Sequence, residues 1–159
     1  MNKLIFVALL AALGGYFSYS HHSKQQKQDK PIVYGESRFT FKVAGREIEL
    51  VAIGQRYDTE DCEQVRDLVF EKMKAICDGE NDCIESKHQC KNELASNYMD
   101  MLDKQSSRTH YVHIERQSDN LKGVVLFWGL TDDESLQVCN IVLQKIEAQK
   151  SVPATTQCI

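Results

Sequence analysis

Alternating apolar and polar residues predict a β-hairpin in the first third of the chain. In SRFTFKV, which begins at Ser37, every second residue is apolar, as in a strand with one buried face. Ala44-Gly45 interrupts the alternation, and REIELVAIG then resumes it with Ile48 and Leu50 on one face. The end of this second run is apolar on both faces, so we expect the second strand to be more interior than the first.

A second pair of strands is predicted after residue 105. RTHYVHIER, residues 108–116, alternates with Val112 and Ile114 on one face. After the loop QSDNLKG, the run VVLFWGL is apolar on both faces, which indicates a central strand. Trp128, the only tryptophan, lies near the end of this run and is expected in the core.

The stretch from Thr59 to Gln105 predicts two helices that form a hairpin. The first has acidic residues in its first turn, and its end is marked by Asp78-Gly79. The second is expected to begin at Asn81 and to continue through residue 102. The apolar stripe of the first helix is Cys62, Val65, Val69, Met73 and Ile76; that of the second is Cys83, Cys90, Leu94, Tyr98, Met101 and Leu102.

A last helix follows the sequence TDDE, in which Thr131 and Glu134 have the spacing of a capping box. It is expected to run to about Gln149, followed by an irregular tail held down by Cys158. Its inward residues are predicted to be Leu136, Cys139, Val142 or Leu143, and Ile146. The whole pattern predicts a single α+β domain of order ββααββα, with about four antiparallel strands and helices mainly on one face.

The first 36 residues differ from the rest of the chain. Leu4–Phe17 is an apolar run of 14 residues after a short cationic start, which is the length of a signal peptide rather than of a full membrane span. Residues 1–20 are therefore predicted to be a cleaved signal peptide or an N-terminal membrane anchor. Residues 21–36 are predicted to be a polar linker, and the domain is expected to span 37–159.

Cysteine content and charge narrow the class of protein. Six cysteines behind an export segment favour disulfides in an oxidising compartment. Apart from Lys3, 18 basic residues stand against 23 acidic ones, a formal charge of −5, whereas nucleic-acid binding needs a basic surface. We expect no nucleic-acid partner, and membrane contact only through the N-terminal segment.

Helix geometry suggests how the six cysteines pair. In the expected helical hairpin, Cys77 and Cys83 are equally far from the turn and so lie side by side, which makes a Cys77–Cys83 disulfide the preferred pairing. Cys77 with Cys90 is the alternative if residues 78–89 are a loop. Cys83 and Cys90 are too far apart along one helix to bond. Cys62 would then pair with Cys139 in preference to Cys158, and Cys90 with the cysteine that remains.

Two groups of residues invite a chemical role. Cys83, His88 and Cys90 resemble part of a zinc site, but no tight C-x2-C pair accompanies them, so no metal or other cofactor is expected. Tyr111, His113 and Glu115 share one face of a predicted strand. We predict this trio as a binding surface, and an exposed sheet face is the plainer explanation.

These features predict an exported or membrane-tethered protein of the bacterial envelope, periplasmic and possibly held at the inner membrane. Its expected role is that of a non-enzymatic protein-binding module, such as an accessory subunit or an inhibitor or immunity-type protein, with another envelope protein as partner. The alternative is a small periplasmic hydrolase or ligand-binding enzyme that uses Tyr111, His113 and Glu115.

Overall fold

The computed structural model describes residues 32–43, 45–77, 83–148 and 153–159, without the side chains of residues 43, 69–77 and 83–86. The predicted signal peptide or anchor and most of the predicted linker lie outside this part of the chain. Within it, no helix is long and apolar enough to cross a membrane.

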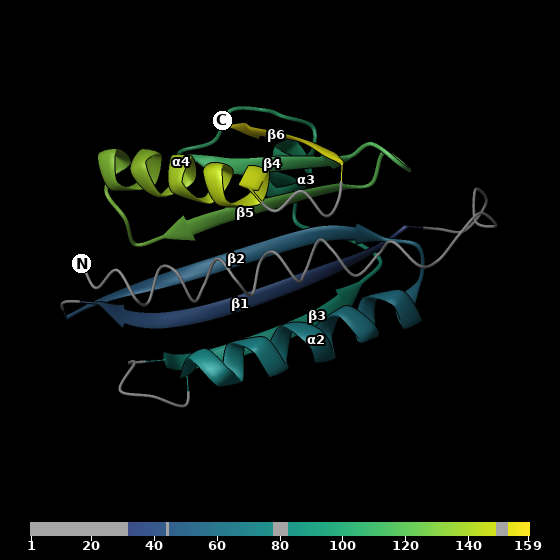
Figure 1. Ribbon diagram of the computed structural model, residues 1–159, viewed down its shortest axis with the longest axis horizontal. Helices are drawn as coiled ribbons and strands as arrows, with labels where there is room; N and C mark the ends of the chain where they lie inside the picture. The colour runs from purple at the N-terminus through teal and green to yellow at the C-terminus, as the bar shows by residue number, and fades with distance from the viewer. Residues whose placement is uncertain (1–31, 44, 78–82, 149–152) are drawn as a thin grey trace.

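The described residues form nine helices and strands, whose arrangement Figure 1 shows. Two long strands and a long helix come first, followed by a third strand and a short helix. A second hairpin, a helix and a final strand complete the chain. In order, the elements are β1 (Val33–Val43), β2 (Arg46–Arg56), α2 (Thr59–Cys77), β3 (Cys83–Lys91), α3 (Ser96–Leu102), β4 (Tyr111–Arg116), β5 (Lys122–Trp128), α4 (Asp132–Ala148) and β6 (Ala154–Cys158).

All six strands belong to one antiparallel sheet with the order β3-β1-β2-β5-β4-β6. This order divides the domain into two units of the same topology. In each unit a hairpin leads into a helix, and the strand after the helix pairs with the first strand of the hairpin. The second strands, β2 and β5, pair antiparallel in the centre, with Val51 opposite Leu126. The units β1-β2-α2-β3 and β4-β5-α4-β6 are therefore related by an approximate half-turn. The sequence shows no internal repeat that would have predicted this repeated topology.

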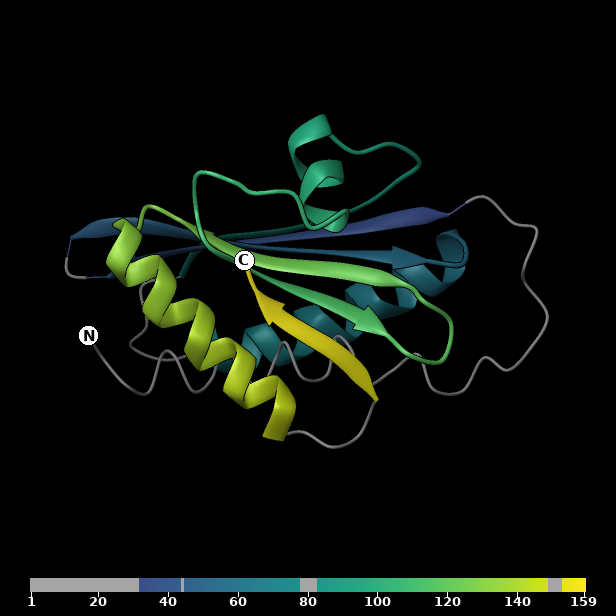
Figure 2. The ribbon, with the colours of Figure 1, turned by 90° about the horizontal axis from the view of Figure 1, so that it is seen from above.

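The helices are divided between the two faces of the sheet (Figure 2). Helices α2 and α4 cover one face, where the larger core cluster contains Phe39, Leu50, Val125 and Phe127. Helix α3 lies alone on the other face, over a smaller cluster centred on Tyr98, Leu102 and Leu126. The two long helices thus share one face, as expected of helices mainly on one face, and α3 is the exception among the described helices.

Both predicted hairpins are present, and glycines with positive φ stand in the first turn and directly after β5. Gly45 has a φ of +80°, the left-handed conformation that a turn between Val43 and Arg46 requires and that glycine adopts without strain. Gly129 ends β5 with a φ of +85°, and a Cβ there would collide with the backbone carbonyl of Glu47. Only glycine fits the second position.

Helix α4 follows its prediction closely. Glu134 accepts hydrogen bonds from the amide and hydroxyl of Thr131, and the amide of Glu134 donates to the Thr131 hydroxyl at 3.3 Å. This is the capping box expected from TDDE. Cys139 and Val142 are buried as predicted, but Leu136 is 43% exposed, so its predicted inward orientation is wrong.

Three expectations about secondary structure are wrong. The predicted second helix is strand β3 over its first half and helix only from Ser96, because residues 87–91 alternate between the two sheet faces. The tail is strand β6, which pairs with β4, so β3 and β6 together make six strands in place of four. Strand β1 begins at Val33, so the last residues of the predicted linker are part of the sheet.

Candidate functional site

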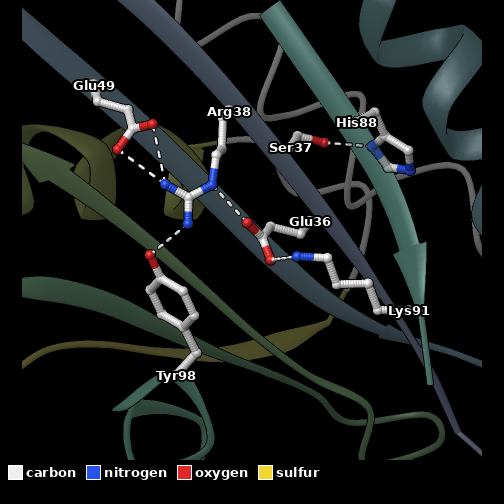
Figure 3. Close-up of polar contacts among 7 residues, drawn as sticks. All are labelled: Glu36, Ser37, Arg38, Glu49, His88, Lys91 and Tyr98. Atoms are coloured by element: carbon white, nitrogen blue, oxygen red, sulfur yellow. Dashed lines mark hydrogen bonds and ion pairs between the residues drawn. The ribbon is translucent and has the colours of Figure 1, made fainter. Parts of the chain in front are cut away.

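The strongest group of polar contacts in the described residues is centred on Arg38, in the middle of β1 (Figure 3). Its Nε donates to Glu36 at 2.5 Å, and one terminal nitrogen donates to both carboxylate oxygens of Glu49 at 3.0 and 3.1 Å. The other terminal nitrogen donates to the Tyr98 hydroxyl at 2.8 Å. Lys91 Nζ completes the group by donating to Glu36 at 2.7 Å. We call these five residues the Arg38 network.

Strand register explains why these residues meet. Side chains two apart on β1 share a sheet face, which places Glu36 and Arg38 together on the face that carries α3. Glu49 comes from β2 and Lys91 from β3, the two strands that flank β1. Tyr98 reaches the group from α3, and its ring centroid lies 5.7 Å from the guanidinium carbon.

One carboxylate of the Arg38 network is buried, and the other charged side chains are partly exposed. The Glu36 side chain is 6% exposed, whereas those of Arg38, Glu49 and Lys91 are 31%, 30% and 37% exposed. Burial opposes the charge of Glu36, but its bonds to Lys91 and Arg38 prevail and lower its pKa. Hydrogen bonds to Glu36 and Glu49 outweigh burial at Arg38 and raise its pKa. Both groups are therefore charged, and they hold each other in place.

A second group lies on the opposite face, beneath α2. The ring of His88 on β3 has its Nδ1 atom 2.7 Å from the Ser37 hydroxyl and its Nε2 atom 3.6 Å from both sulfurs of the Cys62–Cys90 disulfide. Burial is the main cause that lowers the pKa of His88 to about 4, with a further contribution from the charge of Arg56. His88 is therefore a neutral imidazole at physiological pH.

The Ser37–His88 pair resembles part of a hydrolase site, but it lacks access. Ser37 is 0% exposed, so its hydroxyl cannot reach a substrate in this structure. The other ring nitrogen of His88 faces the disulfide, where a catalytic dyad would place an orienting carboxylate.

The predicted trio on β4 lies partly under α3. Tyr111, His113 and Glu115 share one sheet face, as expected, but Tyr111 and His113 are 0% and 1% exposed. The Tyr111 hydroxyl donates to the Gln105 carbonyl at 2.6 Å. Glu115 is partly exposed and pairs with Lys104. These contacts tie the loop after α3 to the sheet; a binding role for the trio stays a prediction.

Aromatic and charged side chains also gather at the far end of β4. Asp119 accepts from Arg116 Nε at 2.8 Å and from the Tyr57 hydroxyl at 2.5 Å. The Arg116 and Asp119 side chains are 8% and 17% exposed. Burial and the bond to Asp119 raise the pKa of Tyr57 to about 12. This cluster joins the start of α2 to the β4–β5 turn.

The disulfides correct the predicted connectivity. Cys62 bonds with Cys90 and Cys139 with Cys158, so the predicted Cys62–Cys139 bond is wrong. The prediction assumed a helical hairpin, whereas β3 returns along the sheet beneath the start of α2. Each observed disulfide joins the helix of one unit to its last strand. Cys77 with Cys83 stays a prediction, since neither side chain is described.

Disulfides of this kind indicate an oxidising, extracytoplasmic compartment. Sequence reasoning missed both the Arg38 network and the contact of His88 with the disulfide. The usable signal was the alternation of Lys87, His88, Gln89 and Cys90, which identifies β3 and divides these side chains between the faces. No protein family matches this chain, and comparison with curated proteins and with solved structures finds no significant similarity.

Proposed function

We propose that this protein is an exported protein-binding module of the bacterial envelope, non-enzymatic, with its contact surface on the β3-β1-β2 half of the sheet. The surface is the Arg38 face, defined by partly or fully exposed side chains on the side of the sheet that carries α3: Tyr34, Arg38, Thr40, Glu49, Gln89 and Lys91. The partner is another envelope protein, for which this chain acts as an accessory subunit or an inhibitor. The periplasm, with the N-terminal segment as signal or anchor, is the proposed location.

The observation that carries the proposal is the fixed orientation of Arg38. Its guanidinium is held by Glu36, Glu49 and Tyr98, yet about a third of the side chain is exposed. Ordering a free arginine on binding costs side-chain entropy, on the order of 1 kcal/mol, and a side chain already held in place avoids most of that cost. Such a residue is suited to recognition.

The composition of the Arg38 face supports the same conclusion. Arginine and tyrosine are, with tryptophan, the residues most enriched where alanine substitution weakens protein complexes. Here Arg38 and Tyr34 lie among acceptors and donors of both charges, so a partner can make directional polar contacts. A surface built on adjacent strands is also more rigid than one built on loops.

No comparable observation supports the alternative function, an enzyme that uses Tyr111, His113 and Glu115. It would use His113, whose ring is 1% exposed and whose Nε2–H donates to the Leu102 carbonyl at 3.0 Å. Substrate would have to displace α3 to reach it. We therefore propose the binding function alone.

Site-specific photo-crosslinking tests the proposal. A photoreactive residue replaces Gln89 on the Arg38 face or, as the matched control, Gln144 on the exposed side of α4. In envelope preparations from the source cells, the full chain labelled at Gln89 should crosslink to one protein species, and the chain labelled at Gln144 should not. Equal labelling from both positions, or none from Gln89, would exclude the Arg38 face as the contact surface.

A charge reversal refines the same test. Glu49→Lys places a cation beside Arg38 and should abolish the crosslink from Gln89, while Glu147→Lys on α4 should leave it intact. Circular dichroism of both variants distinguishes loss of contact from loss of fold.

A further inference from the structure

A histidine packs against only one of the two described disulfides. In the first unit, His88 Nε2 lies 3.6 Å from the sulfurs of both Cys62 and Cys90. The second unit has its disulfide, Cys139–Cys158, between the corresponding elements α4 and β6. In the described part of the chain, no histidine contact with that disulfide is present among the hydrogen bonds. The two disulfides therefore differ in their chemical surroundings.

Two cysteines and one histidine with ligand atoms within 4.8 Å of one another form a metal-ligating group once the cysteines are thiolates. In zinc sites the sulfurs lie about 2.3 Å and the nitrogen about 2.0 Å from the ion. Tetrahedral angles then place nitrogen and sulfur roughly 3.5 Å apart, and the two sulfurs roughly 3.8 Å apart. The distances from His88 to the sulfurs already match, so only the two sulfurs need to separate.

The surroundings of His88 suit a ligand. Ser37, buried on β1, lies 2.7 Å from Nδ1 and can accept a hydrogen from it, which leaves the lone pair of Nε2 directed at the sulfurs. Ligating histidines are usually oriented by such a partner on their other nitrogen.

We propose that reduction of the Cys62–Cys90 disulfide converts this group into a zinc(II) site with Cys62, His88 and Cys90 as ligands. A dithiol supplies the two electrons: the sulfur–sulfur bond breaks, two thiols form, and the dithiol becomes a disulfide. Zinc then replaces the two thiol protons, which pass to solvent. The link between α2 and β3 is covalent under oxidising conditions and metal-mediated under reducing conditions.

The site differs from the zinc fragment considered in the sequence. The sequence alone groups Cys83 with His88 and Cys90 and predicts no metal there. The fold replaces Cys83 with Cys62, which lies 26 residues from His88 in the sequence and is brought to it by the packing of α2 on β3.

Cobalt(II) and zinc(II) titration of the reduced full-length protein under anaerobic conditions tests the proposal. Cobalt should bind in a 1:1 ratio at this site, produce sulfur-to-metal charge-transfer absorption, and be displaced by zinc. His88→Asn should weaken binding at least tenfold, and Ser37→Ala should weaken it about tenfold through lost orientation of the ring. Unchanged affinity in His88→Asn would refute the site.

The chain contains other ligands, so the site must be located. Zinc should protect Cys62 and Cys90 from alkylation, as mapped by mass spectrometry, and leave the alkylation of Cys139 and Cys158 unchanged. The double variant Cys62→Ser/Cys90→Ser retains the other four cysteines and His21-His22, and should lose the charge-transfer signal. Protection of another pair, or a signal that survives in the double variant, would overturn the assignment.

If reduction unfolds the protein, the proposal is still testable by circular dichroism. Zinc should then restore the native spectrum of the reduced wild type but not of reduced His88→Asn, because metal binding supplies folding free energy. Failure of zinc to restore the wild type would count against the site. None of these outcomes depends on the Arg38 face, which lies on the other side of the sheet.

Discussion

Arg38 on β1 and Tyr98 on α3, sixty residues apart in the sequence, are joined by a hydrogen bond of 2.8 Å from guanidinium to phenol oxygen. This bond connects the short helix α3 with the β3-β1-β2 half of the sheet, which carries the Arg38 face. It also makes α3 part of the proposed contact surface, since Tyr98 helps to hold Arg38.

Tyr98→Phe should separate the polar from the apolar contribution of this contact. The ring stays in the core, so the variant should lose only about 1 kcal/mol of the free energy of unfolding. Tyr98→Ala should lose about 3 to 5 kcal/mol, because it also empties the space beneath α3. Urea denaturation measures both variants, and equal losses would show that the ring contributes nothing to the packing of α3.

The free energy of unfolding should fall as the pH is lowered from about 6.5 toward 4. Burial lowers the pKa of His88 to about 4 and also lowers the pKa of His113, whereas an unfolded histidine titrates near 6.5. Between these values the unfolded chain binds protons that the folded chain does not, so acid favours unfolding, by at most about 1.4 kcal/mol per pH unit for each histidine.

Denaturation in urea at several pH values from 7 to 4.5 measures this dependence, and NMR titration of the ring protons assigns it. The double variant His88→Asn/His113→Asn serves as control and should show a much weaker slope. A wild-type protein with constant stability over this range would contradict the buried, neutral state of both rings.

Asp119→Asn should destabilise the domain by about 3 kcal/mol. The substitution leaves the buried guanidinium of Arg116 without its charged partner, and it weakens the acceptor of the Tyr57 hydroxyl. Bonds to Arg116 and Tyr57 outweigh burial and lower the pKa of Asp119, so its contribution is present above the ordinary aspartate pKa and is lost as the pH falls through the lowered value.

Asp67→Asn is the matched control for this variant. Asp67 also pairs with an arginine, Arg66, but both side chains are well exposed, so no measurable loss of stability is expected. Thermal denaturation of the two variants at pH 7 compares them directly.

Peptide mapping of the non-reduced protein should recover Cys62 linked to Cys90 and Cys139 linked to Cys158. The two loops span 28 and 19 residues, so the chain-entropy model assigns each bond roughly 3 to 4 kcal/mol. Replacing the two cysteines of either disulfide with serine should therefore lower the melting temperature, and the decrease should be similar for the two disulfides. A peptide that joins Cys62 to Cys139 would contradict the fold.

Local patterns in the sequence determined much of the secondary structure. Alternation over residues 37–50 and 108–116 predicted the strands that have one buried face, and the continuous apolar run over 124–130 predicted a central strand. The Thr131–Glu134 capping box predicted the start of α4, since those contacts involve only residues three apart. Such signals depend on neighbours along the chain and need no knowledge of the fold.

The tertiary structure decided the features that depend on which strands become neighbours. Strands β3 and β6 lie at the two edges of the sheet, and their sequences are mostly polar, so neither shows the apolar alternation that predicted the two hairpins. The burial of His113 depends on where α3 lies, and that position is set by packing across some 15 residues of chain. The disulfides, the Arg38 network and the contact of His88 with Cys62 all join separate elements, so they exist only once the strand order β3-β1-β2-β5-β4-β6 has formed.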